Sequence, residues 1–307
     1  MLSRTAASAI PYGMTSDEGS RMPERTIVVL GGGGVKGMAH AGAWRAIEEF
    51  GIAVQEIVGT SIGSLVGACI AGGQTAEHLY ARARALKRQD IVTLNRWAFL
   101  LNGISESAVF RPDAFRDYLE ETLPVERFEQ LVMPLSINAV HLETGRIDWF
   151  GVDGRTDVTL AQAVYASCAL PLFYPPAEIY GETYVDGGVR DALPIQRAAD
   201  RGADLVLAVD VAAGEVKDSK DTVSKGLVAI HHRVMDIMTY SAKRDRLISW
   251  SGPELLYVRP RLDGYSTFDF ERTEFFLEEG YRATHEALRG RFGEPAASGS
   301  SPKQAAG

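Results

Sequence analysis

Short apolar runs alternate with longer, helix-like segments along most of the chain. The runs are rich in β-branched residues and end at glycine or polar positions, which is typical of strands buried on both faces of a sheet. The clearest run is Thr26 to Leu30, which four glycines follow. Strands are expected at 26–30, 57–58, 135–140, 146–150, 183–185, 204–211 and 255–258.

The segments between these runs have the length and spacing of helices. Gly51 and Gly202 stand where two of them end, and Pro112 stands where another begins. Helices are expected at 38–50, 65–71, 75–89, 112–123, 160–167, 194–201, 226–250 and 273–289. This order predicts an α/β fold with a mainly parallel sheet, whose chemistry gathers at the carboxyl ends of the strands.

The pattern weakens at both ends of the chain. Residues 1–25 are polar and rich in Ser, Gly and Pro, so a disordered leader is expected, with Met14 or Met22 as alternative starts. Residues 293–307 are of low complexity and are expected to be a disordered tail. One domain is expected over 26–292. Within it, 94–104 is aromatic but weakly patterned, and is either ordinary core or a lid and acyl-chain wall.

The composition of the chain limits the classes of partner and the cellular locations that are expected. The 307 residues carry a net charge of −8 without a basic block, which argues against nucleic acid. No run of eighteen apolar residues predicts a membrane span. Cys69 and Cys168 both lie in apolar stretches and are expected to be buried free thiols in a reducing compartment. A cytoplasmic protein is expected, with peripheral membrane contact left open.

The first candidate catalytic motif is Gly59-Thr60-Ser61-Ile62-Gly63, a G-x-S-x-G sequence between an apolar strand and an apolar helix. A serine on so sharp a turn needs small neighbours, here Gly59 and Gly63, and the turn exposes its hydroxyl at the N-terminus of the helix. The pattern also occurs in ordinary loops. The strand–turn–helix context favours a nucleophile at Ser61.

The glycine loop Gly31-Gly32-Gly33-Gly34-Val35-Lys36-Gly37 permits three interpretations. It matches the dinucleotide pattern G-x-G-x-x-G, but no acidic residue ends the second expected strand. It is not a P-loop, because Gly37 follows Lys36 where Ser or Thr is required. The third interpretation is an oxyanion hole, in which consecutive glycines let several backbone N–H groups point at one developing negative charge.

A base for Ser61 is sought among the acids and the six histidines. His40, His78, His231, His232 and His285 fall within expected helices, and His141 ends a strand, so none occupies the strand-end loop of an ordinary hydrolase triad. Asp186 in Asp186-Gly187-Gly188 follows a strand directly. An Asp-Gly turn is common, but burial would raise the basicity of this carboxylate.

Together these motifs, with Ala166-Ser167-Cys168-Ala169-Leu170-Pro171-Leu172-Phe173 between them, resemble the patatin-like phospholipase family. The resemblance covers about 26–215 and is weaker to about 290. It implies a three-layer α/β/α fold and a Ser-Asp dyad without histidine. Ser61 would be the nucleophile, Asp186 the proton acceptor, and Gly32 to Gly34 the oxyanion hole. Lys36 matches a position that is often arginine, and Asp-Gly-Gly replaces a frequent Asp-Gly-Ala.

The resemblance implies a serine acyl hydrolase of lipid carboxylic esters, acting through an acyl-enzyme without metal or cofactor. Lipid or acyl-ester substrates would be its partners, with Gly37, Gly187 and Gly188 supporting the motifs. Two alternatives stay open. One is a Ser-His-Asp triad esterase that uses a downstream histidine such as His231. The other is a nucleotide-binding or catalytically silent module that uses the Gly31–Gly37 loop.

Overall fold

The computed structural model describes residues 22–95, 108–212, 224 and 226–295. Its eight-stranded sheet has the order β5-β6-β3-β2-β1-β7-β8, and β4 pairs with β3 outside this path. The strands are β1 (Thr26–Leu30), β2 (Val54–Gly59), β3 (Leu135–His141), β4 (Ile147–Gly151), β5 (Ala177–Ile179), β6 (Glu182–Asp186), β7 (Leu205–Val209) and β8 (Glu254–Val258).

The middle of the sheet is parallel. β1 lies between β2 and β7, and the parallel order continues to β3 on one side and to β8 on the other. All five residues of β1 and of β7 are buried, as their continuous apolar sequences predict. Leu30 pairs with Gly59, so the glycine loop and the Ser61 turn leave the sheet at the same edge.

One side of the sheet is antiparallel. β4 and β6 both pair with β3 in this sense, and β5 pairs with β6. The sequence predicts β4 and β6 without their direction, and it does not predict the three-residue β5. The expected α/β/α fold with a mainly parallel sheet is confirmed, and the antiparallel strands extend it.

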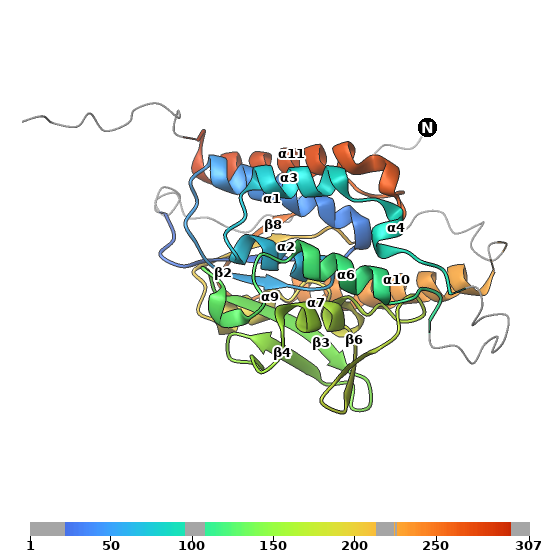
Figure 1. Ribbon diagram of the computed structural model, residues 1–307. Helices are drawn as coiled ribbons and strands as arrows, with labels where there is room; N and C mark the ends of the chain where they lie inside the picture. Colours follow the sequence, from blue (N-terminus) through green and yellow to red (C-terminus); the bar gives the residue numbers. More distant parts are fainter. Residues whose placement is uncertain (1–21, 96–107, 213–223, 225, 296–307) are drawn as a thin grey trace, which may run out of the picture.

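Helices cover both faces of the sheet (Figure 1). α1 packs against α11 and α3 on one face, with α2 close to β1 and β2. α9 contacts β1 and β7, and α10 contacts α8. The α-helices are α1 (Met38–Glu49), α2 (Ile62–Ala71), α3 (Ala76–Ala85), α4 (Arg88–Ile91), α6 (Asp113–Thr122), α7 (Leu160–Cys168), α8 (Gly188–Asp191), α9 (Ile195–Asp200), α10 (Leu227–Ile248) and α11 (Thr273–Phe292). Short 3₁₀ helices are η1 (Gly34–Gly37), η3 (Phe128–Gln130) and η4 (Phe270–Arg272).

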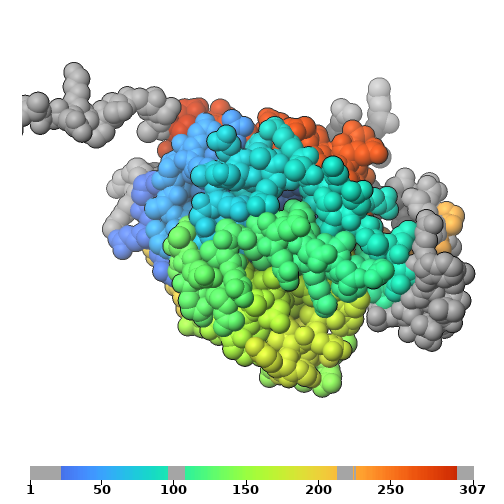
Figure 2. Space-filling model, in the orientation of Figure 1, coloured from blue at the N-terminus to red at the C-terminus, as the bar shows by residue number. Residues whose placement is uncertain are grey.

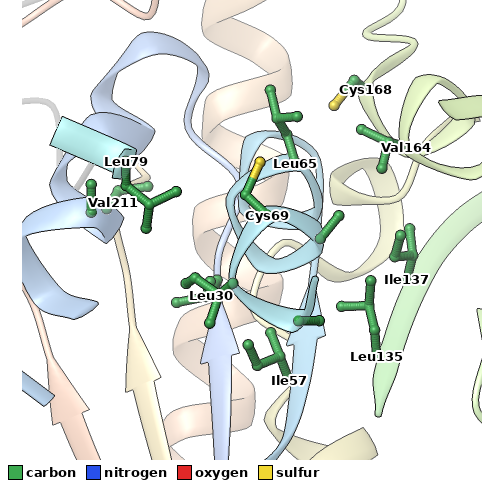
Figure 3. Packing of buried hydrophobic residues seen from close by; sticks show 14 of the residues in the cluster. Leu30, Ile57, Leu65, Cys69, Leu79, Leu135, Ile137, Val164, Cys168 and Val211 are labelled. Carbon is green, nitrogen blue, oxygen red and sulfur yellow. The ribbon is translucent and has the colours of Figure 1, made fainter. Parts of the chain in front are cut away.

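The hydrophobic core consists of a larger and a smaller cluster. Alternate residues of β1 belong to different clusters. Val28 and Leu30 of β1 belong to the larger cluster, and Ile27 and Val29 belong to the smaller one. Figure 3 shows α2 over the parallel strands, with Leu65 and Cys69 among the apolar side chains. Cys69 and Cys168 are buried free thiols on different helices, as predicted. Figure 2 shows segments from the first and middle thirds of the chain packed into one continuous face.

Several boundaries differ from the sequence-based expectations. The helix after Ser61 begins at Ile62 rather than at 65. The segment 75–89 divides into α3 and α4, because Leu86 and Lys87 are extended between them. Of the proposed lid at 94–104, only residues 94 and 95 lie within the described part of the chain. Arg25, at the end of the expected leader, pairs with the buried Glu56.

Candidate active site

The turn between β2 and α2 holds Ser61 in an uncommon backbone conformation. Ser61 has a φ of 53° and a ψ of −129°, outside the regions that non-glycine residues prefer. Its glycine neighbours make the turn possible. A Cβ at Gly63 would lie 2.1 Å from the Leu30 carbonyl oxygen, and one at Gly59 would lie 2.6 Å from the Ser64 Cα. The backbone N–H of Ser61 donates to the Ser167 hydroxyl at 2.8 Å.

Asp186 meets Ser61 from the antiparallel side of the sheet. It is the last residue of β6 and pairs with Ala139 of β3. The Ser61 hydroxyl donates to Asp186 Oδ2 at 2.6 Å. The other oxygen, Oδ1, accepts from the N–H of Gly188 at 2.7 Å, at the start of α8. Both carboxylate oxygens are therefore engaged, and the carboxylate is held against the serine.

The surroundings of Asp186 increase its affinity for a proton. Its side chain is buried, and it is 3% exposed as a residue. Burial raises the pKa of Asp186 to about 6, against the opposing effects of the hydrogen bonds from Ser61 and Gly188. A carboxylate with this pKa is a far better proton acceptor near neutrality than an exposed aspartate.

The glycine loop lies across from Ser61 at the end of β1. The N–H of Gly31 donates to the Val209 carbonyl and that of Gly32 to the Ala192 carbonyl, both at 3.0 Å. Within the described residues, the N–H groups of Gly33 and Gly34 have no hydrogen-bond acceptor. A Cβ at Gly32 would lie 3.2 Å from the Ser61 Cβ, so this loop passes directly beside the serine.

His40 on α1 supports the glycine loop from behind. Its Nε2 lies 2.8 Å from the Gly31 carbonyl oxygen, and its side chain is fully buried. Burial lowers the pKa of His40 to about 4, so the ring is neutral at physiological pH. Since a carbonyl only accepts, the hydrogen of this neutral ring belongs on Nε2. The sequence identified His40 only as a packed helix residue.

Lys36 also faces this site. Only 2% of Lys36 is exposed, and burial lowers the pKa of its ammonium despite attraction to Asp236, Asp210 and Asp263. Each of these acids has another base beside it. Asp210 binds Lys243, whereas Asp236 and Asp263 lie beside His232 and Arg259. Gly37 ends the 3₁₀ turn that contains Lys36.

A largely apolar cavity opens in front of Ser61 and Asp186. Its apolar lining comes from α1, α2, α4, α6 and the loops beside them. The apolar lining residues include Met38, Ile62, Leu86, Ile91, Phe115, Leu170, Tyr174 and Phe268. Much of the polar wall comes from α10, which contributes His232, Asp236, Thr239 and Lys243. The cavity therefore joins the candidate nucleophile to an apolar wall.

The histidines divide into one that lines this cavity and five that do not. His232 lines it, with Nδ1 3.4 Å from Asp236 and Nε2 3.5 Å from the Thr267 hydroxyl. The sequence did not single out His232, because it lies on a long helix far along the chain. Among the described residues, no group of three or more His, Cys, Asp or Glu side chains is arranged to hold a metal ion.

The comparison with known families settles the relationship. The model of the family described as patatin-like phospholipase matches residues 28–199, which is more than half of the chain. The chain belongs to the patatin-like phospholipase family. The match covers the glycine loop, Ser61 and Asp186, and so includes every motif that carried the resemblance.

Relatives of this patatin-like chain include longer proteins. A lysophospholipase NTE1 of Coccidioides immitis is 29% identical over 283 residues, which are 85% of this chain and 17% of that protein. An uncharacterised NTE family protein of Mycobacterium tuberculosis is 32% identical over 203 residues, which are 66% of this chain and 53% of the other. The chain thus spans about half or less of the length of these relatives.

A solved structure supports the patatin-like fold. The crystal structure of VipD from Legionella pneumophila aligns with a TM-score of 0.51 at 15% identity, covering 91% of this chain and 70% of VipD. No helix of the described residues has both the length and the apolar character that a membrane span requires.

Proposed function

We propose that this protein is a serine acyl hydrolase that cleaves carboxylic esters of lipids through Ser61 and Asp186. The observation that carries the proposal is the 2.6 Å hydrogen bond from the Ser61 hydroxyl to Asp186, made at the edge of an apolar cavity. Membership of the patatin-like phospholipase family and the name lysophospholipase carried by several relatives support the same reaction class.

The first half of the reaction forms an acyl-enzyme. Asp186 accepts the hydroxyl proton of Ser61 while the Oγ bonds to the ester carbonyl carbon. The tetrahedral intermediate then collapses, the bond to the alcohol oxygen breaks, and Asp186 returns the proton to this leaving oxygen. In the second half, water gives a proton to Asp186 and attacks the acyl carbon. The fatty acid departs as Ser61 regains its proton.

The oxyanion donors are the N–H groups of Gly33 and Gly34. These two groups lack an acceptor within the described residues, whereas the N–H of Gly32 is already bonded to Ala192. Gly32 instead provides room beside Ser61. Preorganised backbone donors of this kind typically contribute about 2.7–4 kcal/mol each to transition-state stabilisation.

The cavity favours an ester with a long apolar part. Its lining is dominated by aliphatic and aromatic side chains, and burying apolar area contributes roughly 25 cal/mol per Å². A fatty acyl chain fits such a wall, while the ester carbonyl reaches Ser61. Lysophospholipids and other lipid acyl esters are therefore the substrate class that we propose.

A triad esterase is the second candidate, because His232 lines the same cavity. Its two ring nitrogens face Asp236 and Thr267, however, whereas the Ser61 hydroxyl donates to Asp186. A nucleotide-binding module is the third. The glycine loop that would have to hold the phosphate in such a module is packed closely against its neighbours, since a Cβ at Gly33 would lie 2.8 Å from the Val211 carbonyl oxygen.

The test combines covalent labelling with turnover. We expect the wild type to react with a fluorophosphonate probe and to hydrolyse p-nitrophenyl esters. Ser61→Ala and Asp186→Asn should each lower kcat/KM by on the order of 10⁴-fold, whereas the exposed pair Ser249→Ala and Asp200→Asn should not. Unchanged turnover in the first two variants would exclude the dyad.

The same assay separates the alternatives. Asparagine variants of His231, His232 and His285 should retain most of the activity. A loss in one of them as large as that of Ser61→Ala would support a triad instead. Tight binding of NAD or ATP in calorimetric titration, without probe labelling, would support the nucleotide-binding module.

A further inference from the structure

α10 presents two different faces. Its 22 residues begin after Gly226, and only Lys243 among them is buried. One face lines the cavity in front of Ser61 through His232, Met235, Asp236, Thr239, Tyr240 and Lys243. These positions recur every three or four residues, so they share one side of the helix. α10 is therefore a peripheral helix that forms part of the cavity wall.

The opposite side of α10 is apolar, and no other described element is packed over it. We call Leu227, Ile230, Val234, Ile237 and Met238 the α10 stripe; their spacing places them on the side away from the cavity. Leu227 is 77% exposed and Met238 61% exposed, and the other three are also exposed. Val228 and Ile248 are the other exposed large apolar residues of α10. Those elsewhere in the described chain are Met22, Leu94, Val132, Leu142, Tyr180 and Phe275.

We propose that the α10 stripe is the surface by which this enzyme rests on a lipid bilayer. The inference depends on the proposed function, because a lipid ester substrate resides in such a bilayer. Docking through the stripe would place the bilayer against the same helix that forms the cavity wall. A lipid that leaves the bilayer would then pass beside α10 on its way to Ser61.

The arrangement of the helix fits a flat position in the interface. Five aliphatic or thioether side chains within twelve residues give an apolar face that can enter the boundary between head groups and acyl chains. Beyond Met238 the same side carries Ser241 and Asp245 before Ile248 at the end of the helix, so the continuous apolar contact lies in the first half of α10. The exposed Arg244 flanks this side, where a long cationic side chain reaches head groups.

A second copy of the chain fits the stripe less well. Residues 227–238 cover only about 18 Å along one side of a single helix. Stable protein interfaces bury about 800 Å² on each partner. The heptad-like spacing of apolar residues also ends after two heptads, since Ser241 and Arg244 occupy the next two positions of the repeat. A paired coiled coil normally sustains the pattern for three or more heptads.

The net charge of the chain indicates which lipid composition the α10 stripe should bind. At −8 the protein is repelled by a strongly anionic surface. Contact through the α10 stripe depends instead on apolar burial, which salt does not screen. We therefore expect binding to zwitterionic phosphatidylcholine vesicles that persists at high salt.

The experiment compares two double variants of the full chain. Val234→Glu/Ile237→Glu places charges in the α10 stripe, and Val132→Glu/Leu142→Glu makes matched changes at exposed sites on other elements. Co-sedimentation with phosphatidylcholine vesicles should fall at least about tenfold for the first variant only. Hydrolysis of lysophosphatidylcholine in those vesicles should fall with it. Hydrolysis of soluble p-nitrophenyl butyrate should stay at the wild-type rate in both variants, because neither changes a cavity residue.

The outcomes separate this inference from the proposed function. Equal vesicle binding by the wild type and both variants would overturn the bilayer contact. A dimer by sedimentation that becomes a monomer only in Val234→Glu/Ile237→Glu would overturn it in favour of a second copy. If the wild type binds vesicles through the stripe but hydrolyses neither ester, the surface stands and the proposed hydrolase activity fails.

Discussion

Asp186 shows how one side chain is adapted by its position. An exposed aspartate is a weak base, but this one is buried and receives hydrogen bonds from Ser61 and Gly188. Burial disfavours its charged form and raises the pKa of Asp186 to about 6. The Ser61 hydroxyl then faces a base that is ionised at neutral pH and still binds a proton readily.

The acidic limb of the activity should report this pKa. Because only ionised Asp186 accepts the Ser61 proton, kcat/KM for a soluble ester should be level above pH 7 and fall about tenfold per pH unit below about 6. Initial rates from pH 4 to 9 measure this. A limb centred near pH 4, the value of an ordinary aspartate, would contradict the assignment.

Folding stability provides an independent check on the same residue. A raised folded-state pKa means that the native protein binds this proton more tightly than the unfolded chain, so ionisation of Asp186 destabilises the fold as pH rises from about 4 through 6. Asp186→Asn should therefore be more stable than the wild type at pH 8, by up to about 3 kcal/mol at about 1.4 kcal/mol per pKa unit. At pH 4 this advantage should disappear in urea unfolding.

Among the elements, the glycine loop depends on α1 for its shape. His40 of α1 donates from Nε2 to the Gly31 carbonyl, and the N–H groups of Gly31 and Gly32 bond to Val209 and Ala192. These contacts hold the first part of the loop, directly before Gly33 and Gly34, which line the cavity. His40 is thus a positioning residue, separated from the substrate by the loop itself.

His40→Ala should lower kcat by about tenfold to a hundredfold and leave KM nearly unchanged, because displaced donors weaken transition-state rather than ground-state binding. His40→Gln, which keeps an N–H donor, should recover part of the loss. Steady-state kinetics on a soluble ester test this, with circular dichroism to confirm folding. A rise in KM without a change in kcat would show that His40 supports binding of the ester instead.

Across the whole molecule, a buried ion pair ties α10 to the sheet. Asp210 directly follows β7, and the Lys243 ammonium donates to its carboxylate at 2.6 Å. The Tyr257 hydroxyl of β8 donates to the same carboxylate oxygen at 2.6 Å. Since Lys243 is the one buried residue of α10, this pair is an anchor that helps to keep the helix beside the cavity, together with the ion pair of Arg246 with Asp191 of α8.

Lys243→Met should destabilise the protein by about 3–5 kcal/mol, because it leaves the Asp210 carboxylate buried without its cation. Arg244→Met, at the exposed neighbouring position, serves as the matched control and should change the free energy of unfolding little. Urea unfolding followed by circular dichroism measures both. Equal stability of the two variants would show that α10 is held by its other contacts.

The amino-acid sequence by itself determined the local features of this protein. The continuous apolar run of β1 requires a strand buried on both faces, and Gly59 and Gly63 permit the turn at Ser61 because neighbouring backbone leaves no room for a Cβ. The family followed from motifs whose order and spacing are readable along the chain. Fold class and family were therefore predictable from local chemistry.

Only the tertiary structure decided how these pieces meet. Apolar periodicity does not encode strand direction, so the antiparallel course of β6 that places Asp186 against Ser61 was not readable from sequence. The occupation of the Gly32 N–H and the approach of His232 to the cavity depend on residues far apart in the chain. The apolar spacing of α10 predicted a helix, but which of its faces lines the cavity is set by its packing against α8 and by the Lys243–Asp210 ion pair. That packing leaves the α10 stripe exposed.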